Sequence, residues 1–479
     1  MPGIEEKIKT VKDHIKELFR LFEKQPTIGL LCLGVLCIVC LIWVVYKSDL
    51  NSTRGFTVFI VTVSTLIIIF LVASAFALFK QGSYRPTFKG RYFIGIDLGR
   101  SKIEYCLIDY EEFKKNPNGS AFKIYSGIKR TVATNFEANY RLLITIIDEI
   151  SKKAKPQGIK HIDGIGVGLP GQVDLVEGIL IGSPGFQHAN NKDFVNKFRK
   201  QIESDLEDMG HHPEIFKEDI PIKIDNDVRC ATRYLWKSMR FKDGICILLG
   251  NGLGSGIVLG GRLLYGHNFM AGEIGHTTIC CSICCKGGNL LHGNKCSCDT
   301  EGYHWEMYAS SHGITKVAKL LDKNEYMRLK SGHRDLIRES PYAELLEREP
   351  FRSHSREHFY GNDVGDVSNE LTSYFFSLAY HAGDKYAQQV VDKFLEYLAV
   401  GIANYINVIN PEAVYLGGGM ISGFFNDDDN VETEVHNKVR KFVLHPARNV
   451  TISRLSNDPN ASIGAALIFH DDSYPGNVS

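Results

Sequence analysis

The sequence predicts an α/β globular region preceded by two transmembrane helices. Two uncharged apolar runs near the N-terminus, Ile28 to Tyr46 and Phe56 to Phe79, each match the ~20 residues that a bilayer-crossing helix needs. Beyond residue 91, strand-like apolar runs, glycine turns and helical stretches recur, so we expect both strands and helices there. Lys plus Arg and Asp plus Glu both number 55 in the 479 residues. This balance lacks the basic excess of nucleic-acid-binding proteins, and we expect no nucleic-acid partner.

The two apolar runs predict a hairpin that places both of its ends on one side of a membrane, because only the short segment 47–55 joins them. Lys and Arg are frequent before the first run and after the second, but the connecting segment holds only Lys47 and Arg54. Positive charge favours the cytoplasmic side. We therefore expect an integral, multi-pass membrane protein that contacts lipid through residues 28–79 and whose large C-terminal region faces the cytosol.

Residues 1–27 are predicted to form an amphipathic helix that ends before the first apolar run. Apolar residues recur here at intervals of three and four, which places them on one helical face, and they are Ile4, Ile8, Val11, Ile15, Leu18 and Phe22. A helix on the membrane surface and a short coiled-coil pairing segment both fit this stripe.

The first segment of the soluble region predicts a β-hairpin with an acidic residue near its turn. An apolar run from Tyr92 to Ile96 meets Asp97, a glycine turn follows, and alternating residues run from Ile103 to Ile108. A carboxylate at the end of an apolar strand is unfavourable unless it faces a metal ion or solvent. Asp97 is therefore a candidate site residue, and an ordinary turn aspartate is the alternative.

Two further segments combine strands with clustered glycines. In Cys246 to Gly261, a glycine-rich loop at 250–256 lies between two strand-like runs, and backbone N–H groups in such a hairpin approach phosphates closely. Later, a strand at 413–416 is followed by Gly417 to Gly419, against which a flat adenine or ribose would fit. Tight turns use the same residues, so the pattern by itself is weak.

The segment Ile222 to Trp236 predicts a strand that ends in Asp225-Asn226-Asp227, where a helix begins. Aspartate is a good helix N-cap, and capping alone would explain the pattern. An aspartate at such a junction beside a cleft can also act as a general base.

Taken together, these segments resemble the ROK family of sugar kinases, of the glucokinase and N-acetylmannosamine kinase type, within the actin/hexokinase ATPase superfamily. The resemblance runs from about residue 91 to 472 and rests on eight segments that occur in the same order. They are IDLGRSK at 96–102, GVGLPGQVD at 166–174, IDNDVRCA at 224–231, GNGLGSGIVLGG at 250–261, AGEIGH at 271–276, the CSC and WEMYAS of 296–310, INPEAVYLGGG at 409–419 and ASIGAA at 461–466.

The resemblance implies a two-lobed actin-like ATPase fold of the RNase H-like type that closes over a cleft. It places an N-terminal lobe at 91–225 and a C-terminal lobe at 226–479. The second lobe carries the cysteine cluster and a charged insertion at 324–365, which we interpret as surface and not catalytic. Family members commonly form dimers, so a homodimer is expected. Family repressors carry a DNA-binding segment ahead of this region, whereas two apolar runs stand there in this chain.

The resemblance also assigns roles to individual residues. Asp227 would be the catalytic base that takes a proton from the attacking hydroxyl. The sugar would be bound by Gly171, Asn226, Glu273, His276 and Glu306. ATP and Mg²⁺ would be bound by Asp97, Gly99, Ser101, Lys102, Gly252, Gly254, Gly417, Gly418 and Gly419.

A structural zinc ion is implied as well, held in the family by one histidine and three cysteines. His276, Cys296 and Cys298 match this pattern, and the third cysteine has no counterpart. His304 or one of four inserted cysteines would complete a four-coordinate site. Free thiols in a surface loop are the alternative.

Two functions follow from these assignments. The first is a membrane-anchored, ATP-dependent kinase that phosphorylates a hydroxyl of a hexose or N-acetylhexosamine. The second is a non-catalytic sensor of sugar or nucleotide that is tethered to the membrane. Arg100 motivates the second, because the family usually has glycine there, and an arginine would either clamp a phosphate or block the loop.

Overall fold

The computed structural model describes residues 91–100, 102–132, 136–183, 186, 190–208, 215–216, 220–280, 303–329, 373–425 and 429–475. All of them belong to one compact unit, Phe88–Ser479. Within these ranges, no helix combines the length and the apolar character that crossing a bilayer requires. The predicted amphipathic helix at 1–27, the predicted spans within 28–79 and most of the charged insertion at 324–365 lie outside the described residues.

Two mixed five-stranded sheets organise the chain. The first has the order β3-β2-β1-β4-β8 and the second has the order β11-β10-β9-β14-β15. The strands of the first sheet are β1 (Tyr92–Leu98), β2 (Lys102–Asp109), β3 (Lys123–Arg130), β4 (Gly164–Leu169) and β8 (Ile222–Asn226). Those of the second are β9 (Gly244–Leu249), β10 (Leu253–Leu259), β11 (Arg262–Leu263), β14 (Ala413–Gly417) and β15 (Thr451–Arg454).

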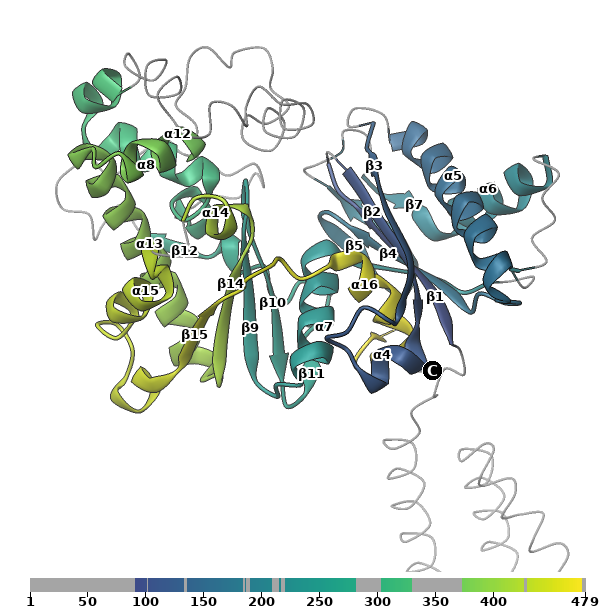
Figure 1. The fold of residues 1–479 in the computed structure, drawn as a ribbon. Coiled ribbons are helices and arrows are strands. Elements are labelled where there is room, and N and C mark those ends of the chain that lie inside the picture. The colour runs from purple at the N-terminus through teal and green to yellow at the C-terminus, as the bar shows by residue number, and fades with distance from the viewer. Residues whose placement is uncertain are drawn as a thin grey trace, which may run out of the picture. The chain divides into compact units, whose positions relative to one another are not determined.

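Helices cover both sheets (Figure 1). The first sheet contacts α5 and α6, and the second packs with α8, α12, α13 and α15 around one apolar cluster. These helices are α5 (Phe136–Ala154), α6 (Phe194–Asp208), α8 (Ser311–Leu321), α12 (Ser373–His381), α13 (Lys385–Ile409) and α15 (Val431–Val439). Smaller elements are α4 (Tyr110–Lys115), the sheet of β5 (Gln172–Asp174), β6 (Ile179–Gly182) and β7 (Lys192–Asp193), the pair β12 (Thr278–Cys280) and β13 (Tyr303–His304), and α14 (Gly419–Ser422).

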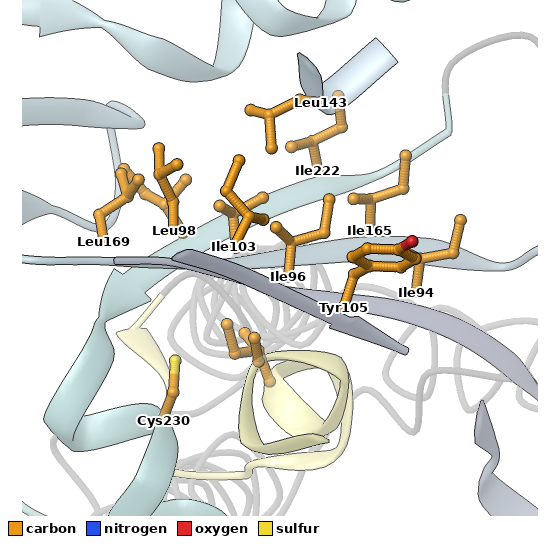
Figure 2. Packing of buried hydrophobic residues seen from close by; sticks show 14 of the residues in the cluster. Ile94, Ile96, Leu98, Ile103, Tyr105, Leu143, Ile165, Leu169, Ile222 and Cys230 are labelled. Carbon is orange, nitrogen blue, oxygen red and sulfur yellow. The ribbon is translucent and has the colours of Figure 1, made fainter. Parts of the chain in front are cut away.

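Side chains of β1 alternate between the two faces of the first sheet, as a strand requires. Ile94, Ile96 and Leu98 join the large apolar cluster beneath α5, whereas Phe93 joins a second cluster on the other face. Figure 2 shows the apolar side chains of β1, β2, β4 and β8 standing on one face beneath Leu143, with Cys230 on the opposite side. The same alternation places Asp97 on the face of Phe93.

That second face is covered by α7 (Asp227–Met239) and α16 (Ala461–Ala466), which lie between the two sheets in Figure 1. Helix α7 contacts β4 and β8 of the first sheet and β10 of the second, and α16 contacts β1, β2 and β4. The lobe boundary at 225/226 stays a prediction. The end of the chain returns to the first sheet, a contact that was not predicted from the sequence.

Two glycines, which have no side chain, allow α16 to approach its neighbours closely. A Cβ on Gly95 would lie 1.8 Å from the carbonyl oxygen of Ser462, and a Cβ on Gly464 would lie 1.7 Å from the carbonyl oxygen of Cys230. Both clashes involve backbone, which cannot move aside as a flexible side chain does. Glycine at these positions is what lets α16 sit between the sheet and α7.

We expect Gly464→Ala to lower the free energy of unfolding by about 1–3 kcal/mol, because the added methyl group forces α16 and α7 apart. The measurement is urea denaturation of the full chain. Gly182→Ala is the matched control, since a Cβ there meets no atom closer than 3.9 Å. Equal stability of the two variants would contradict this account of the packing.

Candidate functional site

Asp97 and Asp227 lie near each other at the carboxyl ends of three parallel strands. Asp97 in β1 pairs with Gly168 in β4, and Gly168 pairs with Asp225 in β8, two residues before Asp227. A Cβ on Gly168 would lie 3.6 Å from Asp97 Oδ1 and 3.5 Å from the Cα of Asp227. The glycine between the two aspartates therefore leaves room that a single methyl group would fill, and this room is bordered by the backbone of Asp227 and the carboxylate of Asp97.

Asp97 has an oxygen without a hydrogen-bond donor. Its Oδ1 atom is buried and accepts no hydrogen bond from any described residue. Burial, followed by the charges of Asp227 and Glu104, raises the pKa of Asp97 well above its usual value, and Lys102 opposes this. Glu104 lies directly across from Asp97 in the antiparallel β2 and is paired with Lys102.

These properties fit a divalent cation at Asp97. A buried carboxylate oxygen without a donor is a group that a Mg²⁺ ion would satisfy. In the part of the chain that the structure describes, no group of three or more His, Cys, Asp or Glu side chains is placed to hold a metal by itself. Mg²⁺ usually binds through one or two carboxylates, water and substrate phosphates, and Asp97 would supply one such carboxylate.

Asp227 is the first residue of α7 and does not cap it. The N-cap is Asn226, whose Oδ1 accepts the Arg229 N–H at 3.1 Å, so the capping explanation for Asp227 is wrong. The Oδ1 atom of Asp227 accepts the N–H of Val228 at 2.8 Å. Burial raises the pKa of Asp227 to about 6, with the charge of Glu273 acting in the same direction and the Val228 hydrogen bond opposing. Such a carboxylate is ionised at neutral pH and still accepts a proton readily.

Asn226 and Gly171, both predicted to bind sugar, lie together. The Nδ2 atom of Asn226 donates to the carbonyl oxygen of Gly171 at 3.1 Å. Gly171 has φ of 108°, and a Cβ there would lie 2.2 Å from the carbonyl oxygen of Gly182. The amide of Asn226 thus joins the start of α7 to the β5–β6 hairpin, in addition to any contact that it makes with a ligand.

The other three predicted sugar ligands form a second group. His276 Nε2 lies 3.9 Å from Glu273 Oε2, and His276 Nδ1 lies 3.8 Å from Glu306 Oε1. Burial raises the pKa of Glu273, which His276 and Arg229 partly offset. The carboxylate of Glu306 also borders the glycine turn, because a Cβ on Gly252 would lie 2.7 Å from Glu306 Oε2.

The glycine loop predicted at 250–256 is shorter than expected. The strands β9 and β10 pair antiparallel, which confirms the hairpin, but the turn contains only Gly250, Asn251 and Gly252. Gly254 lies inside β10, where a Cβ would come within 2.6 Å of Val228. Its role in the structure is therefore to let β10 approach the first turn of α7.

The glycines after β14 form a tight turn. Gly418 has φ of 90°, and a Cβ on it would lie 2.4 Å from the carbonyl oxygen of Leu249. Its N–H donates to Asp458 Oδ1 at 2.6 Å, while a Cβ on Gly419 would meet nothing within 4 Å. The space beside Gly419 is open, as a nucleotide-binding turn requires. Asp458 was not predicted from the sequence, because no local motif marks it.

The loop after Asp97 is closed by its own backbone. The N–H of Gly99 donates to the carbonyl oxygen of Lys102 at 3.0 Å, and the Thr131 hydroxyl donates to the carbonyl oxygen of Gly99 at 2.9 Å. Arg100 is exposed on this turn. The predicted ligand Ser101 lies outside the described residues.

The predicted zinc site is described only in part. Cys296 and Cys298 lie outside the described residues, so zinc binding stays a prediction. His276 and His304 are both described, and their ring centroids are 5.5 Å apart. Burial, with the charge of His276, lowers the pKa of His304, which favours the neutral ring that metal ligation requires.

A buried ion network behind Asp227 was not predicted from the sequence. Asp225 is fully buried and accepts hydrogen bonds from Arg229 Nε, at 2.7 Å, and from Arg233 Nη2. Arg233 Nε also donates to Asp471 Oδ2 at 2.8 Å. Arg229 and Arg233 are four residues apart on one face of α7, but Asp225 belongs to β8 and Asp471 is distant in sequence, so no helical spacing marks the whole network.

With this geometry in place, comparisons with known proteins identify the family. A glucokinase of Halalkalibacterium halodurans is 28% identical over 339 residues, which cover 69% of this chain and 81% of that protein. A xylose repressor of Caldicellulosiruptor bescii is 27% identical, with 68% of this chain and 65% of that protein covered. The crystal structure of a Streptomyces griseus ROK glucokinase with glucose and AMPPNP shares the fold, with a TM-score of 0.51 at 20% identity over 78% of this chain and 98% of that one. Residues 93–472 match the ROK family, and the chain therefore belongs to it.

Proposed function

We propose that this protein is an ATP-dependent kinase that phosphorylates a hydroxyl of a hexose or N-acetylhexosamine. The observation that carries the proposal is the pair Asp97 and Asp227, which lie on either side of Gly168 at the strand ends and both have raised pKa values. Relatives named glucokinase and N-acetyl-D-glucosamine kinase support the same class of reaction.

In the proposed mechanism, Asp227 accepts the proton of the attacking sugar hydroxyl while that oxygen bonds to the γ-phosphorus of ATP and ADP leaves. Asp97 would hold a Mg²⁺ ion, which neutralises phosphate charge when it is bound. Glu273, His276 and Glu306 would orient the sugar by hydrogen bonds to its hydroxyl groups. The open space at Gly419 would admit the nucleotide.

The test is an ADP-release assay on the full chain in nonionic detergent, with ATP, Mg²⁺ and a panel of glucose, N-acetylglucosamine and N-acetylmannosamine. Phosphorylation of one sugar above the ATPase background is the expected result. Absence of transfer to every sugar would reject the kinase.

The xylose repressor among the relatives keeps a non-catalytic sensor as the second candidate. The sensor predicts that sugar raises the melting temperature without turnover. A sugar at 100 times its dissociation constant stabilises the folded state by ~2.7 kcal/mol, which a melting experiment detects.

The raised pKa of Asp227 predicts a pH dependence of the kinase. A base acts only when it is ionised, so kcat/KM should be constant above neutral pH and fall as pH drops through about 6. At pH 5 roughly a tenth of the maximal value should remain, since the pH is then about one unit below the pKa. Melting temperatures measured at each pH exclude unfolding as the cause. An unchanged kcat/KM between pH 7.5 and 5 would contradict the assignment of this base.

We further propose that the chain is anchored in a membrane by residues 28–79, with the kinase region in the cytosol. The uncharged runs and the distribution of Lys and Arg around them support this. We expect the protein to resist alkaline carbonate extraction, and we expect protease to reach the C-terminal region only from the cytosolic side.

We also propose that His276, Cys296 and Cys298 bind zinc and that the protein is a homodimer. Metal analysis of the purified chain would test the first, and mass measurement would test the second.

A further inference from the structure

A cavity of about 340 Å³ lies at the end of α7 that is remote from the candidate site. It is bordered by α4, by the last turn of α7 and by the residues that lead into β9. Asp227 starts α7 and Arg240 follows its last residue, so about 20 Å of helix separate the two places at ~1.5 Å per residue. The volume falls within the ~300–1,000 Å³ of small-molecule sites.

The cavity is lined by cations. Lys114, Lys237, Arg240 and Lys242 contribute to its wall, and no Asp or Glu is among its lining residues. Lys114 is paired with the neighbouring Glu111 at 2.7 Å, which offsets one of these charges. These cations also act on the nearby His470. Burial, followed by the charges of Lys114 and Lys237, lowers the pKa of His470 to about 3.

Arg240 adopts a backbone conformation that favours glycine. It has φ of 60° and terminates α7, with its N–H donating to the carbonyl oxygen of Trp236 at 2.7 Å. Glycine is the usual residue at such a position. Here the arginine side chain reaches across the cavity to α4, where Nη2 donates to the carbonyl oxygen of Lys114 at 3.3 Å.

Aromatic rings complete the wall. Lys237 Nζ lies 4.0 Å from the centroid of the Trp236 ring, and Lys114 Nζ lies 5.2 Å from that of Tyr110. Phe113 and Phe241 also line the cavity. Cations beside flat apolar faces suit a phosphate that is attached to a carbon ring better than a bare inorganic anion.

The cavity also adjoins the place where the described chain begins. The N–H of Tyr110 donates to the carbonyl oxygen of Arg91 at 2.7 Å. Arg91 follows the end of the second predicted span, Phe79, by 12 residues, a length of chain that reaches at most ~40 Å. The proposed membrane anchor at residues 28–79 makes a lipid one of the two sources of ligand considered below.

We propose that this cavity binds a phosphate monoester carried on a compact ring, as found in a phosphorylated lipid headgroup or a soluble cyclitol or sugar phosphate. Lys237, Arg240 and Lys242 would contact the phosphate, and the carbon ring would lie beside the aromatic lining of the cavity. The proposal does not depend on the kinase assignment, because it uses none of the residues at the strand ends.

The test is calorimetric titration of the full chain in nonionic detergent. In the soluble arm the probe is myo-inositol 1-phosphate. In the lipid arm it is dioctanoyl phosphatidylinositol 4-phosphate in mixed micelles, compared with dioctanoyl phosphatidylinositol, which has no monoester. The variant is Arg240→Gly combined with Lys242→Ala, and Arg440→Ala is the control at the exposed end of α15.

We expect the monoester to bind and the double variant to weaken binding by about ten- to a hundredfold, because a charge-assisted hydrogen bond is lost at each position. The fold should survive, since glycine suits φ of 60°. An equal melting temperature checks this. Binding in one arm only supports the proposal and identifies the source of the phosphate. Failure of both probes, or equal binding by the parent and the double variant, would overturn it and leave these cations as partners of the helix C-termini.

Discussion

Asp227→Asn is expected to lower kcat for sugar phosphorylation by about 10²- to 10⁴-fold, the usual contribution of a general base. Asparagine keeps the shape of the side chain but does not accept a proton at neutral pH. The hydrogen bond from Val228 N–H to Oδ1 is retained by the amide oxygen, so the start of α7 should not move. Steady-state kinetics on the full chain measure the loss, and sugar binding followed by melting shift should persist.

Asp193→Asn is the matched control for this experiment. Asp193 also lies at a helix start, where its Oδ1 accepts the N–H of Asn196 at 3.2 Å, but it is exposed and belongs to β7. We expect the kcat of the Asp193→Asn protein to equal that of the parent.

The two variants should also differ in melting temperature, because Asp227→Asn removes a buried charge and Asp193→Asn removes an exposed one. Since the pKa of Asp227 is raised on folding, its charge opposes folding above pH 6 and not below pH 3.8. The Asp227→Asn protein should therefore melt higher than the parent at pH 7.5.

Arg233→Met is expected to lower the free energy of unfolding by about 3–5 kcal/mol, because it leaves buried carboxylates without their cation. Arg233 is fully buried and binds Asp225, Asp471 and the hydroxyl of Tyr265. Burial alone would raise the pKa of Asp471, but the charge of Arg233 and a hydrogen bond from Ser473 hold it below the usual value. Urea denaturation measures the loss.

Arg440→Met makes the same chemical change on an exposed residue and should alter stability by less than about 0.5 kcal/mol. Adding Asp471→Asn to Arg233→Met removes one negative charge along with the positive one. This double variant should regain part of the lost stability, since the remaining buried pair of Asp225 and Arg229 is balanced. A double variant that is no more stable than Arg233→Met alone would reject the charge-balance explanation.

The two predictions concern neighbouring parts of one site. Asp225 accepts hydrogen bonds from the side chains of Arg229 and Arg233, and it also accepts the N–H of Asn226 at 2.8 Å. The ion network therefore holds the backbone that leads into Asp227. The Arg233→Met protein should therefore lose kcat as well as stability. The network ties this backbone to Asp471 near the end of the chain.

Elements that depend on local sequence were predicted correctly. The hairpin around Asp97, the strand that ends at Asn226 and the strand at 413–416 all follow from runs of apolar residues and from nearby glycine or aspartate. One local prediction was wrong, because the glycine loop ends at Gly252. The capping alternative for Asp227 was excluded, because Asn226 caps α7. In both cases the deciding contact is with another part of the chain or with a different residue of the same turn.

The order of motifs along the chain was sufficient to determine the family, the two-sheet α/β class and the residue types from which a site is built. Only the tertiary structure decided that Asp97 and Asp227 lie on either side of Gly168, and that α16 returns from the C-terminal part of the chain to cover the first sheet. The physical reason is distance along the chain. Hydrophobic period and turn chemistry act over a few residues, whereas close backbone approach and buried charge balance join residues that are more than 100 positions apart.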